Sequence, residues 1–153
     1  MKNKYFPLFV DLSEKLIVVI GAGKIASRRI LTLVPFSENL LVIAPEASEE
    51  VKQLAAEGKI RWRQEPYNRN QLADADLVLA CTDSPAVNDD IHAACKCLGI
   101  PVNVCSDRTR CDFYFPGVIQ KDNVVVGVTA GGEDHHLAKT VRENIEQVLK
   151  KKV

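Results

Sequence analysis

The chain has 153 residues and equal numbers of basic and acidic side chains, 20 of each, so that its formal charge is zero. This balance argues against a dedicated nucleic-acid binder, which usually carries a basic excess. The longest apolar runs fall far short of the roughly 20 residues that span a bilayer, and the N-terminus lacks a secretory signal. With 46% apolar residues, we expect a globular cytoplasmic protein that binds neither nucleic acid nor membrane.

Short apolar runs alternate with helical patterns as far as Cys105. Continuous apolar strands alternating with helices are typical of a parallel sheet covered on both faces. We therefore predict a Rossmann-type α/β fold. The predicted strands are Leu16–Ile20, Leu40–Ala44, Ile60–Arg63, Leu77–Cys81 and Pro101–Cys105. The predicted helical segments are Lys24 to about Val34, a helix capped by Ser48 and stopped by Gly58, a turn at Asn70–Ala73, and Ala86–Leu98.

The pattern changes after Asp107. Two strand-like runs, Phe113–Gln120 and Asn123–Thr129, flank a turn at Lys121-Asp122 and predict a β-hairpin. Gly131-Gly132 then interrupts the chain before an amphipathic helix over Leu137–Lys151. A hairpin is marginal alone in water, so it should pack on the main sheet or on a second subunit. We divide the chain into residues 1–112, a nucleotide-binding domain, and residues 113–153, an appended dimerisation element.

The cysteines number five, an odd count, and no export signal precedes them. Both observations favour reduced thiols. A zinc site is disfavoured because the usual C-x₂₋₄-C pairs are absent. Cys95 and Cys97 also lie two residues apart in a predicted helix, where side chains point in different directions. We predict no metal site. The five are Cys81, Cys95, Cys97, Cys105 and Cys111.

The stretch "LIVVIGAGKIASRRI" places a glycine motif between a predicted strand and a predicted helix. Gly21 would allow the tight turn, and Gly23 would let a pyrophosphate approach the backbone. Ala26 is small enough for the helix to lie close to the sheet. The free N–H groups of the helix would then face the anion. This context predicts a dinucleotide site, and the alternative is a glycine turn that binds nothing.

Dinucleotide sites often carry an acid at the end of the second strand. Here that place holds Ala44-Pro45, with Glu46 just beyond. Because no Arg or Lys is present there to bind a 2′-phosphate, NAD is favoured over NADP. Thr82 and Asp83 follow the fourth strand, at the edge where open α/β sheets bind ligands. The alternative for Asp83 is a helix N-cap.

The segment "NVCSDRTRCDFYFPG" follows the last predicted strand of the sheet. It brings acids and arginines to the same edge, a combination that suits proton transfer or recognition of an anionic substrate. A charged, solvated loop is the alternative. The polar residues concerned are Ser106, Asp107, Arg108, Arg110 and Asp112.

Seven segments, in order along nearly the whole chain, resemble one known family. They are "YFPLFVDL", "VVIGAGKIASRR", "VIAPE", "ACTDSPAVN", "VNVCSD", "CDFYFPG" and "GVTAGGEDHHLAKTVRENIE". Together they are similar to the N-terminal module of siroheme synthase, the precorrin-2 dehydrogenase/sirohydrochlorin ferrochelatase family. The resemblance implies NAD-dependent oxidation of precorrin-2 to sirohydrochlorin, and some members also insert ferrous iron into that product.

The resemblance also implies roles for particular residues. Lys24-Ile25 and Pro45-Glu46 would contact NAD. The family's key carboxylate falls, in strict register, on Ser106, with Asp107 one residue later. We take Asp107 as the catalytic candidate, because a serine without a neighbouring base accepts a proton poorly. Arg108 and Arg110 would bind the carboxylates of the tetrapyrrole.

In this family the hairpin and the following helix form a dimer interface, so the resemblance implies a homodimer. The small helical domain that usually follows has no counterpart in these 153 residues. His135 and His136 stand where small residues or proline are common. They could bind a metal or a propionate, but surface histidines near a helix start are the favoured interpretation. A non-catalytic subunit that binds NAD or tetrapyrrole is the rival function. A short-chain reductase is disfavoured because no Tyr-x-x-x-Lys pair is present.

Overall fold

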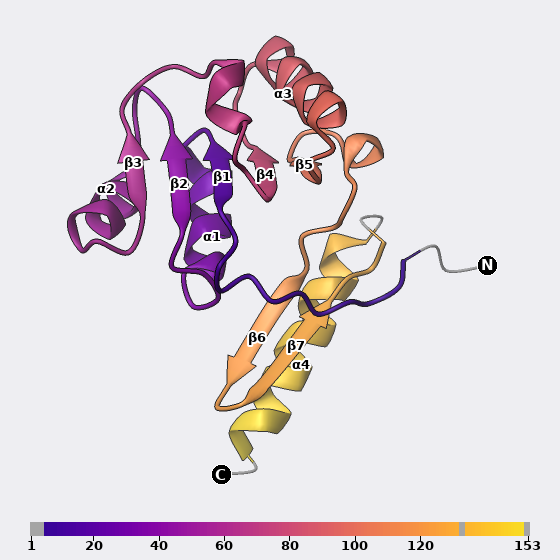
Figure 1. Ribbon diagram of the computed structural model, residues 1–153. Coiled ribbons are helices and arrows are strands. Elements are labelled where there is room, and N and C mark those ends of the chain that lie inside the picture. The colour runs from indigo at the N-terminus through magenta and orange to yellow at the C-terminus, as the bar shows by residue number, and fades with distance from the viewer. Residues whose placement is uncertain (1–4, 132–133, 152–153) are drawn as a thin grey trace. The chain divides into compact units, whose positions relative to one another are not determined.

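The computed structural model describes residues 5–131 and 134–151 and divides the chain into two compact units (Figure 1). One unit is Val10–Phe113. The other consists of Met1–Phe9 and Tyr114–Val153. The break after Phe113 lies one residue beyond the division expected from the sequence, and the N-terminal segment groups with the hairpin and the last helix. Each unit is described by itself below.

The larger unit is built on a five-stranded parallel sheet with the order β3-β2-β1-β4-β5. The central strand β1 pairs with β2 on one side and with β4 on the other, in matching register. The order of the strands therefore reverses at β1, which creates the crevice where open α/β sheets bind ligands. The strands are β1 Ile17–Ile20, β2 Leu40–Ile43, β3 Arg61–Arg63, β4 Leu77–Ala80 and β5 Val102–Val104.

The helices begin and end where local signals indicate. Ser48 caps one helix by accepting a hydrogen bond from the N–H of Val51, and Ser84 caps another by accepting from Val87. Gly99 closes the second helix in the left-handed conformation, with φ of 69°. The helices are α1 Lys24–Leu33, α2 Glu49–Ala56 and α3 Pro85–Leu98, with 3₁₀ turns η1 Arg69–Leu72 and η2 Arg108–Arg110.

The core lies on both faces of this sheet because successive strand residues point to opposite faces. One face packs against α3 and η1 through alternate strand residues such as Val18, Val78 and Val102, together with Ile91 of α3. Ala26, Ile30 and Leu33 of α1 are buried as well. The predicted doubly covered parallel sheet is confirmed.

The second unit contains an antiparallel hairpin of β6 Gly117–Lys121 and β7 Val124–Val128, and the helix α4 His135–Lys151. The hairpin starts four residues later than expected, directly after Pro116, which has no N–H for a strand ladder. Its turn is Asp122-Asn123 rather than Lys121-Asp122. Asp122 adopts a positive φ of 51°, a conformation that Asp and Asn tolerate better than most residues.

The helix α4 packs beside the hairpin, and the Lys121 ammonium donates to the carbonyl of Leu149 at 2.8 Å. None of its described residues is buried. His135 and His136 are exposed in its first turn, and Asp134 accepts a hydrogen bond from the N–H of Leu137. Of the expected Gly131-Gly132 break, Gly131 has φ of 68°, and Gly132 lies outside the described residues. None of the described helices is long and apolar enough to traverse a bilayer.

Candidate functional site

The predicted site residues all lie in the larger unit, in the loops that follow four of its parallel strands or in the helical turns that these loops enter. Because the carboxyl ends of parallel strands share one edge of a sheet, these loops gather at that edge. Gly21 and Gly23 follow β1, Glu46 follows β2, Thr82 follows β4 and Asp107 follows β5. The topology therefore assembles the side chains that the sequence analysis selected.

Gly21 makes the closest contact at this edge. Its φ is +101°, and an added Cβ would lie 2.4 Å from the carbonyl oxygen of Cys81. Its N–H donates to the carbonyl of Ile43 at 2.9 Å. The turn after β1 is thus pressed against the backbone that leaves β4, and only glycine fits there. This turn opens the start of α1 toward the crevice.

Gly23 has the opposite environment. Its φ is −81°, which any residue can adopt, and an added Cβ would meet nothing within 4 Å. The fold itself therefore does not require glycine here. Gly23 is also the N-cap of α1, and this cap supplies no side-chain hydrogen bond. Open space above helix N–H groups that lack a side-chain cap is what an approaching pyrophosphate needs. Lys24 and Ile25, the next two residues, are exposed.

The second loop is fastened to the first through two serines. The hydroxyls of Ser27 and Ser48 are 2.7 Å apart, and the N–H of Ser48 donates to the carbonyl of Ala22. Pro45 and Glu46 are exposed in the loop between β2 and α2. Glu46 therefore remains a candidate ligand for ribose hydroxyls.

Thr82 is held by Asn88, a buried residue that the sequence analysis did not select. The amide oxygen of Asn88 accepts hydrogen bonds from the Thr82 hydroxyl at 2.6 Å and from its N–H at 3.3 Å. The amide nitrogen donates to the Thr82 carbonyl and to the hydroxyl of Ser106. Asn88 thus joins the loops that follow β4 and β5. The Thr82 hydroxyl is occupied by these contacts, and its role toward a cofactor stays a prediction.

The capping interpretation of Asp83 is wrong. Ser84 is the N-cap of α3, because its hydroxyl accepts from the N–H of Val87 at 3.3 Å. Asp83 is exposed beside this cap. Proline at the first helical position, Pro85, fixes the start of the helix one residue after Ser84. Asp83 stays a predicted ligand residue.

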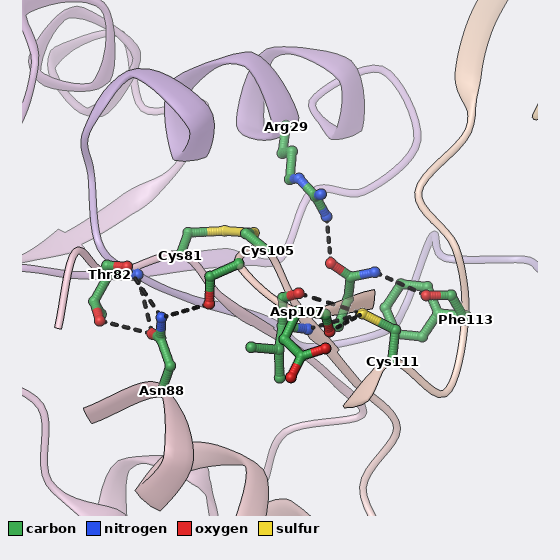
Figure 2. The surroundings of a disulfide bond; sticks show 11 residues. Arg29, Cys81, Thr82, Asn88, Cys105, Asp107, Cys111 and Phe113 are labelled. Atoms are coloured by element: carbon green, nitrogen blue, oxygen red, sulfur yellow. Dashed lines mark hydrogen bonds between the residues drawn. A yellow bond between two sulfur atoms is a disulfide. The ribbon is translucent and has the colours of Figure 1, made fainter. Parts of the chain in front are cut away.

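The expectation that all cysteines are reduced is also wrong. Cys81 and Cys105 form a disulfide across the ends of β4 and β5, with their Cα atoms 5.3 Å apart (Figure 2). Neighbouring parallel strands bring together two residues that are 24 positions apart, and sequence spacing alone does not reveal such a pairing. Each cysteine directly precedes a predicted site residue, Thr82 or Ser106.

Asp107 caps the short turn η2. Its carboxylate accepts from the hydroxyl of Thr109 at 2.6 Å and from the N–H of Thr109 at 2.9 Å. These two bonds lower the pKa of Asp107, and the nearby Arg110 contributes less. Thr109, rather than the neighbouring Arg110, is therefore the main cause of the lowered pKa. Ser106, by contrast, is exposed and accepts from Asn88.

Arg110 bridges two acids. Its guanidinium forms ion pairs with Asp89 of α3 and with Asp107, the second at 3.6 Å. Arg110 was predicted to bind substrate carboxylates. Part of its positive charge is instead balanced by these two acids of the protein. Arg108 is exposed in the same turn.

A second polar residue beneath this edge, Asn103, was also missed. It is buried on β5, accepts from the guanidinium of Arg29 at 2.5 Å and donates to the carbonyl of Phe113 at 2.8 Å. The link runs from α1 through β5 to the end of the unit. A buried polar residue at the centre of the apolar run "VNV" was the available signal, because such a side chain needs hydrogen-bond partners.

Comparison with known proteins identifies the family. The profile of a family described as "Putative NAD(P)-binding" matches residues 8–117. The chain belongs to this NAD(P)-binding family. The matched residues cover the whole sheet and every predicted site residue.

Curated relatives include siroheme synthases from Saccharophagus degradans, 37% identical over 145 residues, and from Nitrosospira multiformis, 36% identical over 149 residues. Each alignment covers 95% of this chain and 32% of the relative, so the chain spans about a third of their length. Among solved structures, SirC, a precorrin-2 dehydrogenase, matches with a TM-score of 0.83 at 22% identity. That match covers 94% of this chain and 70% of SirC, and it supports the fold.

The residues present fit the dinucleotide that the family binds. Gly21 makes the tight turn possible, and Gly23 leaves space above the start of α1. When bound, the nicotinamide cofactor supplies a hydride acceptor or donor. This chain would contribute backbone N–H groups from the start of α1 for the pyrophosphate.

The two glycines should respond differently to substitution. We expect Gly21→Ala to lower the free energy of unfolding by about 2 kcal/mol or more, because the new Cβ adds a backbone clash to an unfavourable φ. Gly23→Ser should change it by a few tenths of a kcal/mol, because serine is a good N-cap. Urea denaturation measures both. Similar losses for the two variants would contradict this division of roles.

The pKa of Asp107 should depend most on Thr109. Carboxyl carbon NMR titration should place Asp107 below the ordinary value of about 3.9, and Thr109→Val should raise its pKa more than Arg110→Gln does. A lowered folded-state pKa stabilises the protein above the unfolded-state pKa, and this contribution is lost as the pH falls through the folded-state value. A larger rise in the Arg110 variant would show that the ion pair dominates.

Proposed function

We propose that this chain is an NAD-dependent precorrin-2 dehydrogenase that forms sirohydrochlorin in siroheme biosynthesis. The observation that carries the proposal is the pairing, at one sheet edge, of an open glycine cradle at Gly23 with a carboxylate turn at Asp107. A dehydrogenation needs both a hydride acceptor and a proton acceptor. The siroheme synthase relatives and the SirC fold support the choice of substrate.

The loop after β2 favours NAD over NADP. Its residues from Ala44 to Ser48 include Glu46 and no Arg or Lys. An acid at this place accepts hydrogen bonds from ribose hydroxyls, whereas a 2′-phosphate would be repelled. We therefore propose that Glu46 binds the adenosine ribose. Lys24, Ile25 and Pro45 would contact NAD beside it through their backbone groups.

In the proposed reaction the macrocycle loses a hydride to NAD and a proton to the protein. An aspartate is ionised at neutral pH, and the lowered pKa of Asp107 keeps its carboxylate in that form, so it can accept that proton. Arg110 holds the Asp107 carboxylate through their ion pair. Arg108 and Arg110 would bind substrate carboxylates, for which guanidinium groups are well suited.

We also propose that the smaller unit mediates a homodimer. Along α4, Leu137, Val141 and Val148 are 53%, 38% and 54% exposed. Their spacing places them on one stripe of the helix. Apolar side chains that remain exposed along one stripe are typical of an interaction surface. The stripe lies on the helix that the sequence predicts to form part of a subunit contact.

The direct test mixes purified protein, NAD and precorrin-2 without oxygen and follows NADH by absorbance. We expect NADH and sirohydrochlorin in equal amounts. Calorimetric titration with NAD and NADP gives the cofactor preference independently, and Gly23→Val should abolish NAD binding while preserving the fold. Binding of NAD and precorrin-2 without NADH formation would instead indicate the non-catalytic subunit.

Asp107 should matter for turnover and not for cofactor binding. We expect Asp107→Ala to reduce kcat by about 10²–10⁴-fold, the usual value of general base catalysis, with an unchanged Kd for NAD. Ser106→Ala should retain most of the activity. The opposite ranking, measured by the same NADH assay, would transfer the role to Ser106 or to a water that it holds.

The dimer should depend on the apolar stripe of α4. Val148→Asp places a charge in that stripe and should convert a dimer into a monomer at micromolar concentration, as measured by light scattering. Gln147→Asp is the matched control, because Gln147 is its exposed neighbour on a different face. A parent protein that is monomeric at this concentration would refute the proposed interface.

A further inference from the structure

The Cys81–Cys105 disulfide has no part in the proposed dehydrogenation, yet it lies where the predicted cofactor and substrate residues meet (Figure 2). Cys81 is the first residue after β4, and Cys105 is the first residue after β5. Both residues are partly exposed. A small dithiol can therefore reach the bond, which a fully buried structural disulfide would not allow.

The bond is linked directly to the glycine turn. The carbonyl oxygen of Cys81 lies only 2.4 Å from the position that a Cβ at residue 21 would take. The N–H of Cys81 donates to the carbonyl of Ile20 at 2.8 Å, and that of Cys105 donates to Ala80 at 2.9 Å. A movement of Cys81 therefore alters the surface against which the cofactor turn is packed.

Two of the other three cysteines, Cys95 and Cys111, are poorly suited to compete for this bond. Burial raises the pKa of the Cys95 thiol to about 11. Burial also raises the pKa of Cys111, whose thiol donates to the carbonyls of Val104 and Asp107. Protonated thiols are poor nucleophiles in disulfide exchange. Cys97 is exposed on α3 and can be replaced as a control.

We propose that Cys81 and Cys105 form a reversible redox modification site that controls cofactor affinity. The proposal rests on the cofactor site described under the proposed function. A dithiol reductant attacks one sulfur of the bond to form a mixed disulfide, and its second thiol then closes a ring. Two electrons pass from the reductant to the protein, Cys81 and Cys105 each end as a thiol, and the reductant ends as a cyclic disulfide. In a reducing cytoplasm, disulfides of this kind are usually transient or sensing.

The oxidised form binds NAD more tightly. The covalent link fixes the ends of β4 and β5, and hence the floor beneath the Gly21 turn, before the cofactor arrives. Preorganisation of this kind increases affinity because less ordering is required on binding. The bonds from Asn88 to Thr82 and Ser106 remain after reduction, so the loops loosen without the sheet coming apart.

The test compares NAD affinity in the two redox states of the full-length parent protein by calorimetry. We expect reduction with dithiothreitol to weaken NAD binding by about tenfold, within the usual range of coupling between sites. The Cys81→Ser/Cys105→Ser variant should match the reduced parent and ignore the reductant. Cys97→Ser should behave as the parent in both states.

A reciprocal measurement distinguishes coupling from general loosening. Linkage requires that saturating NAD make the disulfide harder to reduce by the same tenfold factor, about 30 mV in midpoint potential. Equal NAD affinity in both redox states would overturn this inference and leave the proposed function intact. Five free thiols after equilibration with oxidised glutathione would overturn it as well. Absence of NAD binding in both states would contradict the proposed function and the inference together.

Discussion

The close contact between the turn after β1 and the backbone after β4 is the constraint on which the rest of this site depends. The carbonyl of Cys81 lies so close to Gly21 that the Cβ of any other residue at this position would clash with it. Because β1 is the strand at which the sheet order reverses, the connections after β1 and β4 leave in different directions, and α1 can begin at the mouth of the crevice. Gly23, two residues after Gly21, faces open space at this mouth.

Two buried asparagine side chains hold the loops that contain the predicted catalytic and binding residues. Asn88 uses its amide oxygen and nitrogen to bond Thr82 and Ser106, and Asn103 uses its own to bond Arg29 and Phe113. In a low-dielectric interior such bonds are strong and an unpaired amide is costly. Among the described residues, no buried side-chain nitrogen or oxygen lacks a partner. The loops at the edge are therefore positioned from beneath.

Local signals in the sequence predicted most of the sheet and the helices, because strand hydrophobicity, serine caps and Gly99 act within a few residues. They failed where contacts between residues far apart in the sequence determine the structure. The disulfide partner of Cys81 and one of the two acidic partners of Arg110, Asp89, are 24 and 21 positions away, and only the strand order brings them close. The start of β6 was misplaced because the apolar residues before Pro116 resemble a strand, whereas the proline delays the ladder. The position of the glycine motif was clear, but the contrasting environments of Gly21 and Gly23 required coordinates.

The surroundings of Asp107 set a further condition on the proposed chemistry. Thr109 stabilises the ionised carboxylate, and the lowered pKa makes Asp107 a weaker base than an ordinary aspartate. Binding of a polyanionic tetrapyrrole would bring negative charge close and exclude water, and both effects raise a carboxyl pKa. The substrate itself would therefore strengthen the base that its oxidation needs. Arg110 is shared between Asp89 and Asp107, so its partner at each stage adds a smaller adjustment to the basicity of Asp107, which Thr109 mainly sets.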